Sequence, residues 1–196
     1  MSEVANPKVR NWLKPIIELL SGIPSVVYGF FGLIVIVPLL QRVFDLPVGE
    51  SGLAGSIVLA IMALPTIITV TEDAMRNCPR AMREASLALG ASQWQTIYKV
   101  VIPYSISGIT SGVVLGIGRA VGETMAVLMV TGNAAVIPHS ILEPLRTIPA
   151  TIAAELGEAP AGGAHYEALF LLGVVLFFIS LLINFTVEAV SSGKRK

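Results

Sequence analysis

Residues 77–103 read N-C-P-R-A-M-R-E-A-S-L-A-L-G-A-S-Q-W-Q-T-I-Y-K-V-V-I-P, a polar stretch between two long apolar segments. Pro79 suits the first turn of a helix, where the N–H that proline lacks has no intrahelical partner. The residues from Arg80 to Leu89 favour helix, and Gly90 is a typical helix stop. Ser92 is placed to cap a second helix together with Gln95. The stretch therefore predicts a helical elbow outside the apolar segments.

The apolar segments on either side of this elbow are long enough to cross a membrane, which takes about 20 residues of helix. The chain has four such segments, at about 19–41, 51–71, 103–131 and 167–188. Membrane β-strands are shorter and alternate in polarity, so strands are not expected. The sequence therefore predicts an all-α integral membrane protein with four transmembrane helices.

Composition supports this class. Hydrophobic residues make up 54% of the 196 residues and charged residues 13%, about half of the roughly 25% typical of soluble domains. The net charge is zero, so no basic field for nucleic acid is expected. The single cysteine, Cys78, excludes a disulfide within the chain.

The basic residues outside the spans predict the orientation. Ten lie before the first span, between the second and third, or after the fourth, whereas only Arg42 and Arg146 lie in the other two loops. The positive-inside rule then places both termini and the elbow at 77–102 in the cytoplasm of a cell with an inner membrane. The loop at 132–163 would be external, with a short helix expected near 147–156.

The segment before the first span is expected to lie at the membrane surface. Residues 1–15 carry Trp12 and Lys14, two residue types that favour the boundary between lipid and water. The remaining residues, 16–196, are expected to form one transmembrane domain.

Motifs for catalysis are missing. The sequence has no P-loop, no H-E-x-x-H, no Cys/His cluster and no nucleophile elbow. We therefore expect no catalytic residues, no metal and no cofactor, and no enzymatic activity of the chain alone. His139 and His165 are interpreted as isolated surface side chains.

Two charged residues interrupt the third apolar segment. Arg119 lies near its middle and Glu123 lies four residues further. Arginine at the centre of a membrane helix costs about 2.5–3.5 kcal/mol on insertion scales, so it normally faces a cavity or a partner. The planar guanidinium suits phosphate oxygens, and on a helix Glu123 would share one face with it. The pair is predicted to serve substrate translocation, with a self-neutralising ion pair as the alternative.

Glycines recur at every fourth residue of the same segment, at Gly108, Gly112 and Gly116. Small residues at this spacing allow two membrane helices to approach closely. We expect close helix packing along this row.

The elbow resembles the E-A-A motif of ABC importer permeases, which continues with a glycine and ends in I-x-L-P. Glu84, Ala85 and Gly90 occupy matching positions, while Ser86 replaces the second alanine. Val100 and Ile102 are apolar replacements before the matching Pro103. The resemblance implies a type I permease of the MetI-like fold, whose coupling elbow docks on a cytoplasmic ATP-binding subunit through Glu84, Ala85 and Gly90.

Three further stretches, 22–32, 118–127 and 146–155, resemble phosphate-specific permeases, with the PstC-type subunit as the nearest match. The resemblance implies phosphate as substrate. It also implies three kinds of partner: a second homologous permease, ATP-binding subunits and an extracytoplasmic phosphate-binding protein. Permeases of this kind usually have six spans, so the first two are expected to be lacking here. Two alternatives stay open, a permease for sulfate or molybdate and a non-transporting scaffold or regulatory subunit.

Overall fold

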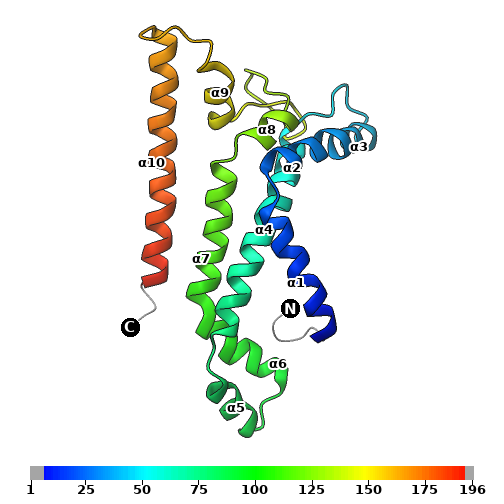
Figure 1. Cartoon of the computed structure of the whole chain (residues 1–196), viewed down its shortest axis with the longest axis vertical. Coiled ribbons are helices and arrows are strands. Elements are labelled where there is room, and N and C mark those ends of the chain that lie inside the picture. Colours follow the sequence, from blue (N-terminus) through cyan, green and yellow to red (C-terminus); the bar gives the residue numbers. More distant parts are fainter. Residues whose placement is uncertain (1–6, 193–196) are drawn as a thin grey trace. The chain divides into compact units, whose positions relative to one another are not determined.

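The computed structural model describes residues 7–192, and the regular structure in this range is helical (Figure 1). In chain order the helices are α1 (Pro7–Gly22), α2 (Ser25–Phe31), the π-helical turn η1 (Gly32–Ile36), α3 (Val37–Val43), α4 (Gly52–Arg76), α5 (Arg80–Ala88), α6 (Gln93–Thr96), the π-helical turn η2 (Ile97–Val101), α7 (Ile102–Val121), α8 (Met125–Val130), α9 (Ile148–Glu155) and α10 (Ala164–Ser192). One isolated bridge pairs Gly132 with Leu145.

Four helical stretches are long and apolar enough to cross a membrane. They are Ser25–Val43, Gly52–Arg76, Gln93–Val121 and Ala164–Thr186. The predicted all-α class with four membrane-crossing helices is confirmed. The residues expected at the membrane surface fall in α1, except for residues 1–6, which lie outside the described part of the chain.

Both π-helical turns lie just before a proline. The turn η1 ends two residues before Pro38, and η2 ends two residues before Pro103. A proline has no N–H to donate to the carbonyl four residues back, and its ring crowds that carbonyl. A locally widened turn accommodates this defect, so the first and third spans continue through their prolines.

The chain folds as two compact units. Within the described range, the first comprises residues 7–22, 64–117 and 183–192, and the second comprises residues 23–63 and 118–182.

In the first unit, α4 and α7 pack closely. A Cβ added at Gly108 would overlap the Cβ of Ala74, and one added at Gly112 would lie 3.2 Å from the Val70 side chain. The Ser105 hydroxyl donates a 3.0 Å hydrogen bond to the carbonyl oxygen of Ala74. The expected close packing is therefore confirmed for Gly108 and Gly112.

In the second unit, α8 packs against the first span and the early part of α4. A Cβ added at Gly32 would lie 2.6 Å from Val58 and 2.7 Å from Val130, so these elements meet at van der Waals distance only because residue 32 lacks a side chain. The buried apolar core of this unit consists of Tyr28, Ile36, Val37, Leu40, Ala54, Val58, Met62, Ala126 and Val130.

The third apolar segment is divided, where a single helical stretch over 103–131 was expected. Helix α7 ends at Val121 and α8 begins at Met125. Gly122 favours an end to the helix because its backbone is costly to order. The Glu123 carboxylate then accepts a 3.3 Å hydrogen bond from the N–H of Ala126 and satisfies the start of α8.

Candidate functional site

Local sequence signals determine where the two helices of the elbow end and begin. Helix α5 ends before Gly90, whose φ of +82° is a left-handed conformation that favours glycine. The Ser92 hydroxyl accepts a 3.3 Å hydrogen bond from the N–H of Gln95, and the Gln95 side chain accepts a 2.8 Å hydrogen bond from the N–H of Ser92. This capping box starts α6 at the predicted position.

Side-chain hydrogen bonds fasten the elbow to the spans of its own unit. Arg83 donates from Nη2 to the carbonyl oxygen of Met75 at 2.7 Å, at the end of α4. Ser86 and Thr96 share a 3.0 Å hydrogen bond between their hydroxyls, which joins α5 to α6. Ser86 is the residue that departs from the family's E-A-A pattern, and Thr96 supplies its partner. The elbow is therefore fixed to α4 and to the start of the third span.

The outer face of the elbow is exposed. None of the residues of α5 is buried, and Glu84, Ala85 and Gly90 are all exposed. Large apolar side chains share this exposure, with Leu89 89% exposed and Tyr98 66% exposed; the others are Met82, Leu87 and Trp94. Apolar side chains presented outside a membrane domain are typical of a docking surface. These apolar residues were not predicted from the sequence, although Leu89 beside the helix stop was a usable signal.

Arg119 and Glu123 do not share one helix. Arg119 lies in the last turn of α7, and Glu123 lies beyond its end, in the link to α8. The expectation that both occupy one helical face four residues apart is therefore corrected, because the helix stops at Val121. Both side chains are partly buried.

A hollow lies beside the link in the second unit. Its volume is about 510 Å³. Gly122 and Thr124, the neighbours of Glu123 in the sequence, line it together with residues of α9, of the turn after it and of α10: Pro149, Ile152, Ala153, Leu156, Gly157 and Leu176. Its walls are mainly apolar with few polar groups.

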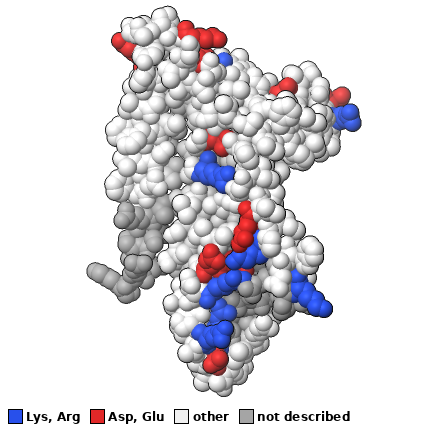
Figure 2. All heavy atoms as spheres, viewed as in Figure 1, with Lys and Arg blue, Asp and Glu red and all other residues white. Residues whose placement is uncertain are grey.

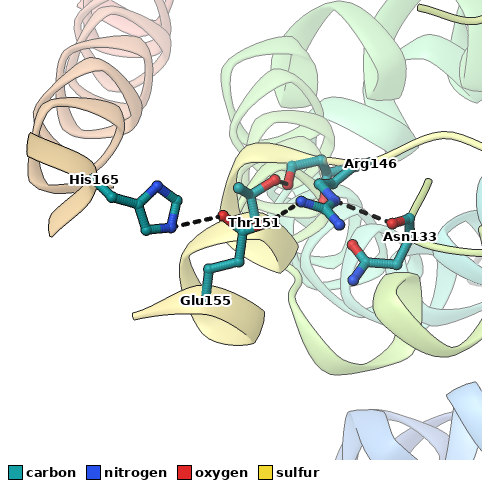
Figure 3. A network of polar contacts seen from close by, with 6 residues as sticks. Asn133, Arg146, Thr151, Glu155 and His165 are labelled. Carbon is teal, nitrogen blue, oxygen red and sulfur yellow. Dashed lines mark hydrogen bonds and ion pairs between the residues drawn. The ribbon is translucent and has the colours of Figure 1, made fainter. Parts of the chain in front are cut away.

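A polar network fixes the segment from 132 to 165 in the same unit (Figure 3). Arg146 forms an ion pair with Glu155, and its Nε donates a 3.1 Å hydrogen bond to the carbonyl oxygen of Asn133. His165, at the start of α10, lies with Nε2 3.2 Å from the other Glu155 oxygen. His165 is thus not isolated, contrary to expectation, whereas His139 is an exposed residue whose backbone N–H donates to Glu143.

Among residues 7–192, no group of three or more His, Cys, Asp or Glu side chains is placed to hold a metal ion.

Four apolar helices with an exposed helical elbow between the second and third define a multi-pass membrane protein. The chain belongs to the family of binding-protein-dependent transport system inner membrane components, which matches residues 1–196.

Several known proteins are similar in sequence to most of this chain. It is 43% identical to a probable ABC transporter permease, YqgH, of Bacillus subtilis, over 100% of this chain and 63% of that protein. It is 37% identical to the phosphate transport system permease protein PstC of Pasteurella multocida and 38% identical to that of Mesorhizobium japonicum. Each PstC match covers 93% of this chain and 62% of the relative. The chain thus spans less than two thirds of the length of these relatives.

Solved structures share the fold. A MetNI methionine ABC transporter in an inward-facing conformation matches with a TM-score of 0.74 and 20% identity, over 98% of this chain and 79% of that one. A second crystal form of the same transporter gives a TM-score of 0.73. The MetI-like fold expected from the elbow is confirmed.

Proposed function

We propose that the chain forms the core of a permease that moves inorganic phosphate into the cytoplasm, driven by ATP hydrolysis on separate subunits. The observation that carries the transport part is the elbow, which Arg83 ties to the end of α4 and which exposes Glu84, Ala85 and Gly90. The names of the PstC relatives support phosphate as the substrate.

The elbow transmits work from the ATP-binding subunits. One such subunit receives Leu89 and the neighbouring apolar side chains of this chain in a groove, and its closure moves the elbow. Because Arg83 binds the end of α4, the movement passes to that span. Permease switching requires that the partner contacts differ between the two states, and the ATP-binding subunits supply this difference.

The substrate passes Arg119. The guanidinium offers several N–H donors in a plane, which suits the oxygens of phosphate. Glu123 lies between two residues that line the hollow at the end of α7. Its carboxylate accepts a hydrogen bond from a protonated phosphate or holds Arg119 between substrates.

The remaining partners follow from the orientation. Both termini and the elbow face the cytoplasm, and the loops at 41–51 and 132–163 face outward. An extracytoplasmic phosphate-binding protein delivers substrate to these loops, and a second homologous permease completes the pore. The permease itself performs no catalysis.

Reconstituted uptake tests this proposal. The chain is co-expressed with its partner permease, ATP-binding subunits and binding protein, and vesicles are offered labelled phosphate with sulfate or molybdate as competitor. We expect ATP-dependent uptake that resists both competitors. Uptake abolished by sulfate or molybdate would favour a permease for that oxyanion. A stable complex with the ATP-binding subunits that transports nothing would favour the scaffold alternative.

A further inference from the structure

A polar groove lies in the first unit, between α1 and the end of α4. It is lined by Asn11, Lys14, Pro15 and Glu18 of α1 and by Arg76, the last residue of α4, and its volume is about 260 Å³. The elbow, the hollow beside Glu123 and the network of Figure 3 lie elsewhere. Neither the transport proposal nor the family resemblance uses these residues.

The two cations of the groove keep hydrogen-bonding capacity. Lys14 Nζ lies 3.7 Å from a Glu18 oxygen and 4.0 Å from an Asp73 oxygen, both beyond hydrogen-bond length. Arg76 forms an ion pair through Nη2 with Glu72 at 3.0 Å, while its buried Nε has no hydrogen-bond partner within residues 7–192. A buried donor without a partner is destabilising, and the partly exposed side chains of Lys14 and Arg76 can donate further hydrogen bonds to a ligand that accepts them.

The charges around the groove restrict what that ligand is. Lys14 and Arg76 contribute two positive charges, and Glu18, Glu72 and Asp73 contribute three negative ones, which leaves one negative charge in excess. A purely anionic ligand meets net repulsion there. A ligand with an anionic and a cationic end meets complementary charges at both ends.

The position of the groove points to the membrane surface. Arg76 is the last residue of a candidate span. Helix α1 exposes apolar residues, with Trp12 78% and Leu19 73% exposed, while Lys14 turns toward α4. Such a helix is typical of the boundary between acyl chains and headgroups. Figure 2 shows Lys, Arg, Asp and Glu side chains gathered where Figure 1 places the end of α4, α1 and the elbow.

We propose that this groove binds the headgroup of a phospholipid that carries both a phosphate and a primary ammonium, as phosphatidylethanolamine does. Lys14 and Arg76 hold the phosphate, and the ammonium donates hydrogen bonds to Glu18 and Asp73. A choline headgroup has no N–H to donate, and a glycerol headgroup has no positive charge. Both bind more weakly for these reasons. The proposal depends on the membrane fold and not on the transported substrate.

Native mass spectrometry of the full chain tests the proposal. The protein is purified in mild detergent and mixed with equal amounts of phosphatidylethanolamine, phosphatidylcholine and phosphatidylglycerol. We expect phosphatidylethanolamine to be retained preferentially, and excess inorganic phosphate not to displace it. Arg76→Gln should lower its retention about tenfold, the order expected for one lost hydrogen bond to a charged group.

Two further variants make the result decisive. Asn11→Trp fills the groove without changing its charge, and it should lower retention even if Arg76→Gln proves unstable through loss of the ion pair with Glu72. Lys99→Gln removes an exposed cation of the same unit outside the groove, and it should leave retention unchanged. Equal retention of the three lipids, preference for phosphatidylglycerol, displacement by inorganic phosphate, or retention unaffected by Asn11→Trp would each overturn the proposal.

Discussion

Arg83 of the elbow reaches back to the last turn of α4, where its Nη2 donates a 2.7 Å hydrogen bond to the carbonyl oxygen of Met75. The carbonyls at the end of a helix have no intrahelical partner, so a cation there satisfies both a hydrogen bond and the helix dipole. The contact joins the exposed helix α5 to the end of the candidate span α4. If the elbow moves as we propose, this hydrogen bond passes the movement to α4.

Replacing Arg83 should separate ATPase binding from transport. Arg83→Met keeps the apolar stem and removes the hydrogen bond to Met75, which is worth about 1.5 kcal/mol for a charged donor. The exposed residues Glu84 and Leu89 are unchanged, so the ATP-binding subunits should still copurify. We expect the amount of substrate taken up per ATP hydrolysed in vesicles to fall about tenfold.

Arg80→Met is the matched control for this experiment. Arg80 is exposed at the start of the same helix, so its replacement removes the same charge without removing the tether. If both variants keep the ratio of uptake to ATP hydrolysis, Arg83 does not transmit movement to α4.

Close packing of α4 on α7 gives a second prediction, with a built-in rescue. In Gly108→Ala the new Cβ overlaps that of Ala74, and overpacking of this kind costs about 1–3 kcal/mol. The variant should unfold at a lower temperature in mild detergent. The double change Gly108→Ala with Ala74→Gly moves the methyl group from one helix to the other, and it should recover most of the loss.

Gly118→Ala serves as the comparison, because a Cβ at Gly118 meets nothing within 4 Å. Alanine is also a better helix former than glycine by about 1 kcal/mol. This variant should match or exceed the parent protein in melting temperature. A double variant no more stable than Gly108→Ala alone would show that the Ala74 contact does not limit the approach of the two helices.

The fold was predictable where its determinants are local. Pro79, Gly90 and the pair Ser92 and Gln95 each act within one helical turn, and they place α5, the turn and α6 as expected. Spans of about 20 apolar residues are equally visible. The end of α7 at Val121 could not be predicted in this way, because an apolar run with scattered glycines also suits one continuous membrane helix.

The candidate site was predictable only in part for a related reason. Arg119 and Glu123 stand out as charges in an apolar run, but the assumption of one helix gave them the wrong relative placement. The network of Arg146, Glu155 and His165 depends on the folding of irregular backbone around Asn133. Contacts between residues far apart in the sequence leave no periodic pattern, so the contact of His165 with Glu155 could not be predicted.

Glu155 should be the residue on which this network depends. One carboxylate oxygen pairs with Arg146 and the other lies 3.2 Å from His165. Glu155→Gln removes the charge that pairs with Arg146 and weakens the contact with His165. Because the side chains of Arg146 and Glu155 are partly exposed, we expect a modest cost of about 1 kcal/mol. The segment at 132–163 should be cleaved faster by added protease.

His165→Gln separates the two halves of the network. It removes one contact of Glu155 but leaves the ion pair with Arg146 intact. Cleavage of the 132–163 segment should therefore rise less than in Glu155→Gln. Equal protection in Glu155→Gln and the parent protein would mean that the segment is ordered by its backbone contacts alone.

Arg119 gives the prediction closest to the proposed transport. Arg119→Gln removes the positive charge and the fork of donors that suits phosphate. Loss of hydrogen bonds to a charged group, worth about 1.5–3 kcal/mol, corresponds to a fall of about ten- to a hundredfold in phosphate uptake. Arg119→Lys keeps the charge but not the planar fork, so it should retain an intermediate rate. Copurification with the ATP-binding subunits should be normal in both variants, since the elbow is unchanged. Uptake by Arg119→Gln at the parental rate would remove Arg119 from the translocation path while leaving the role of the elbow intact.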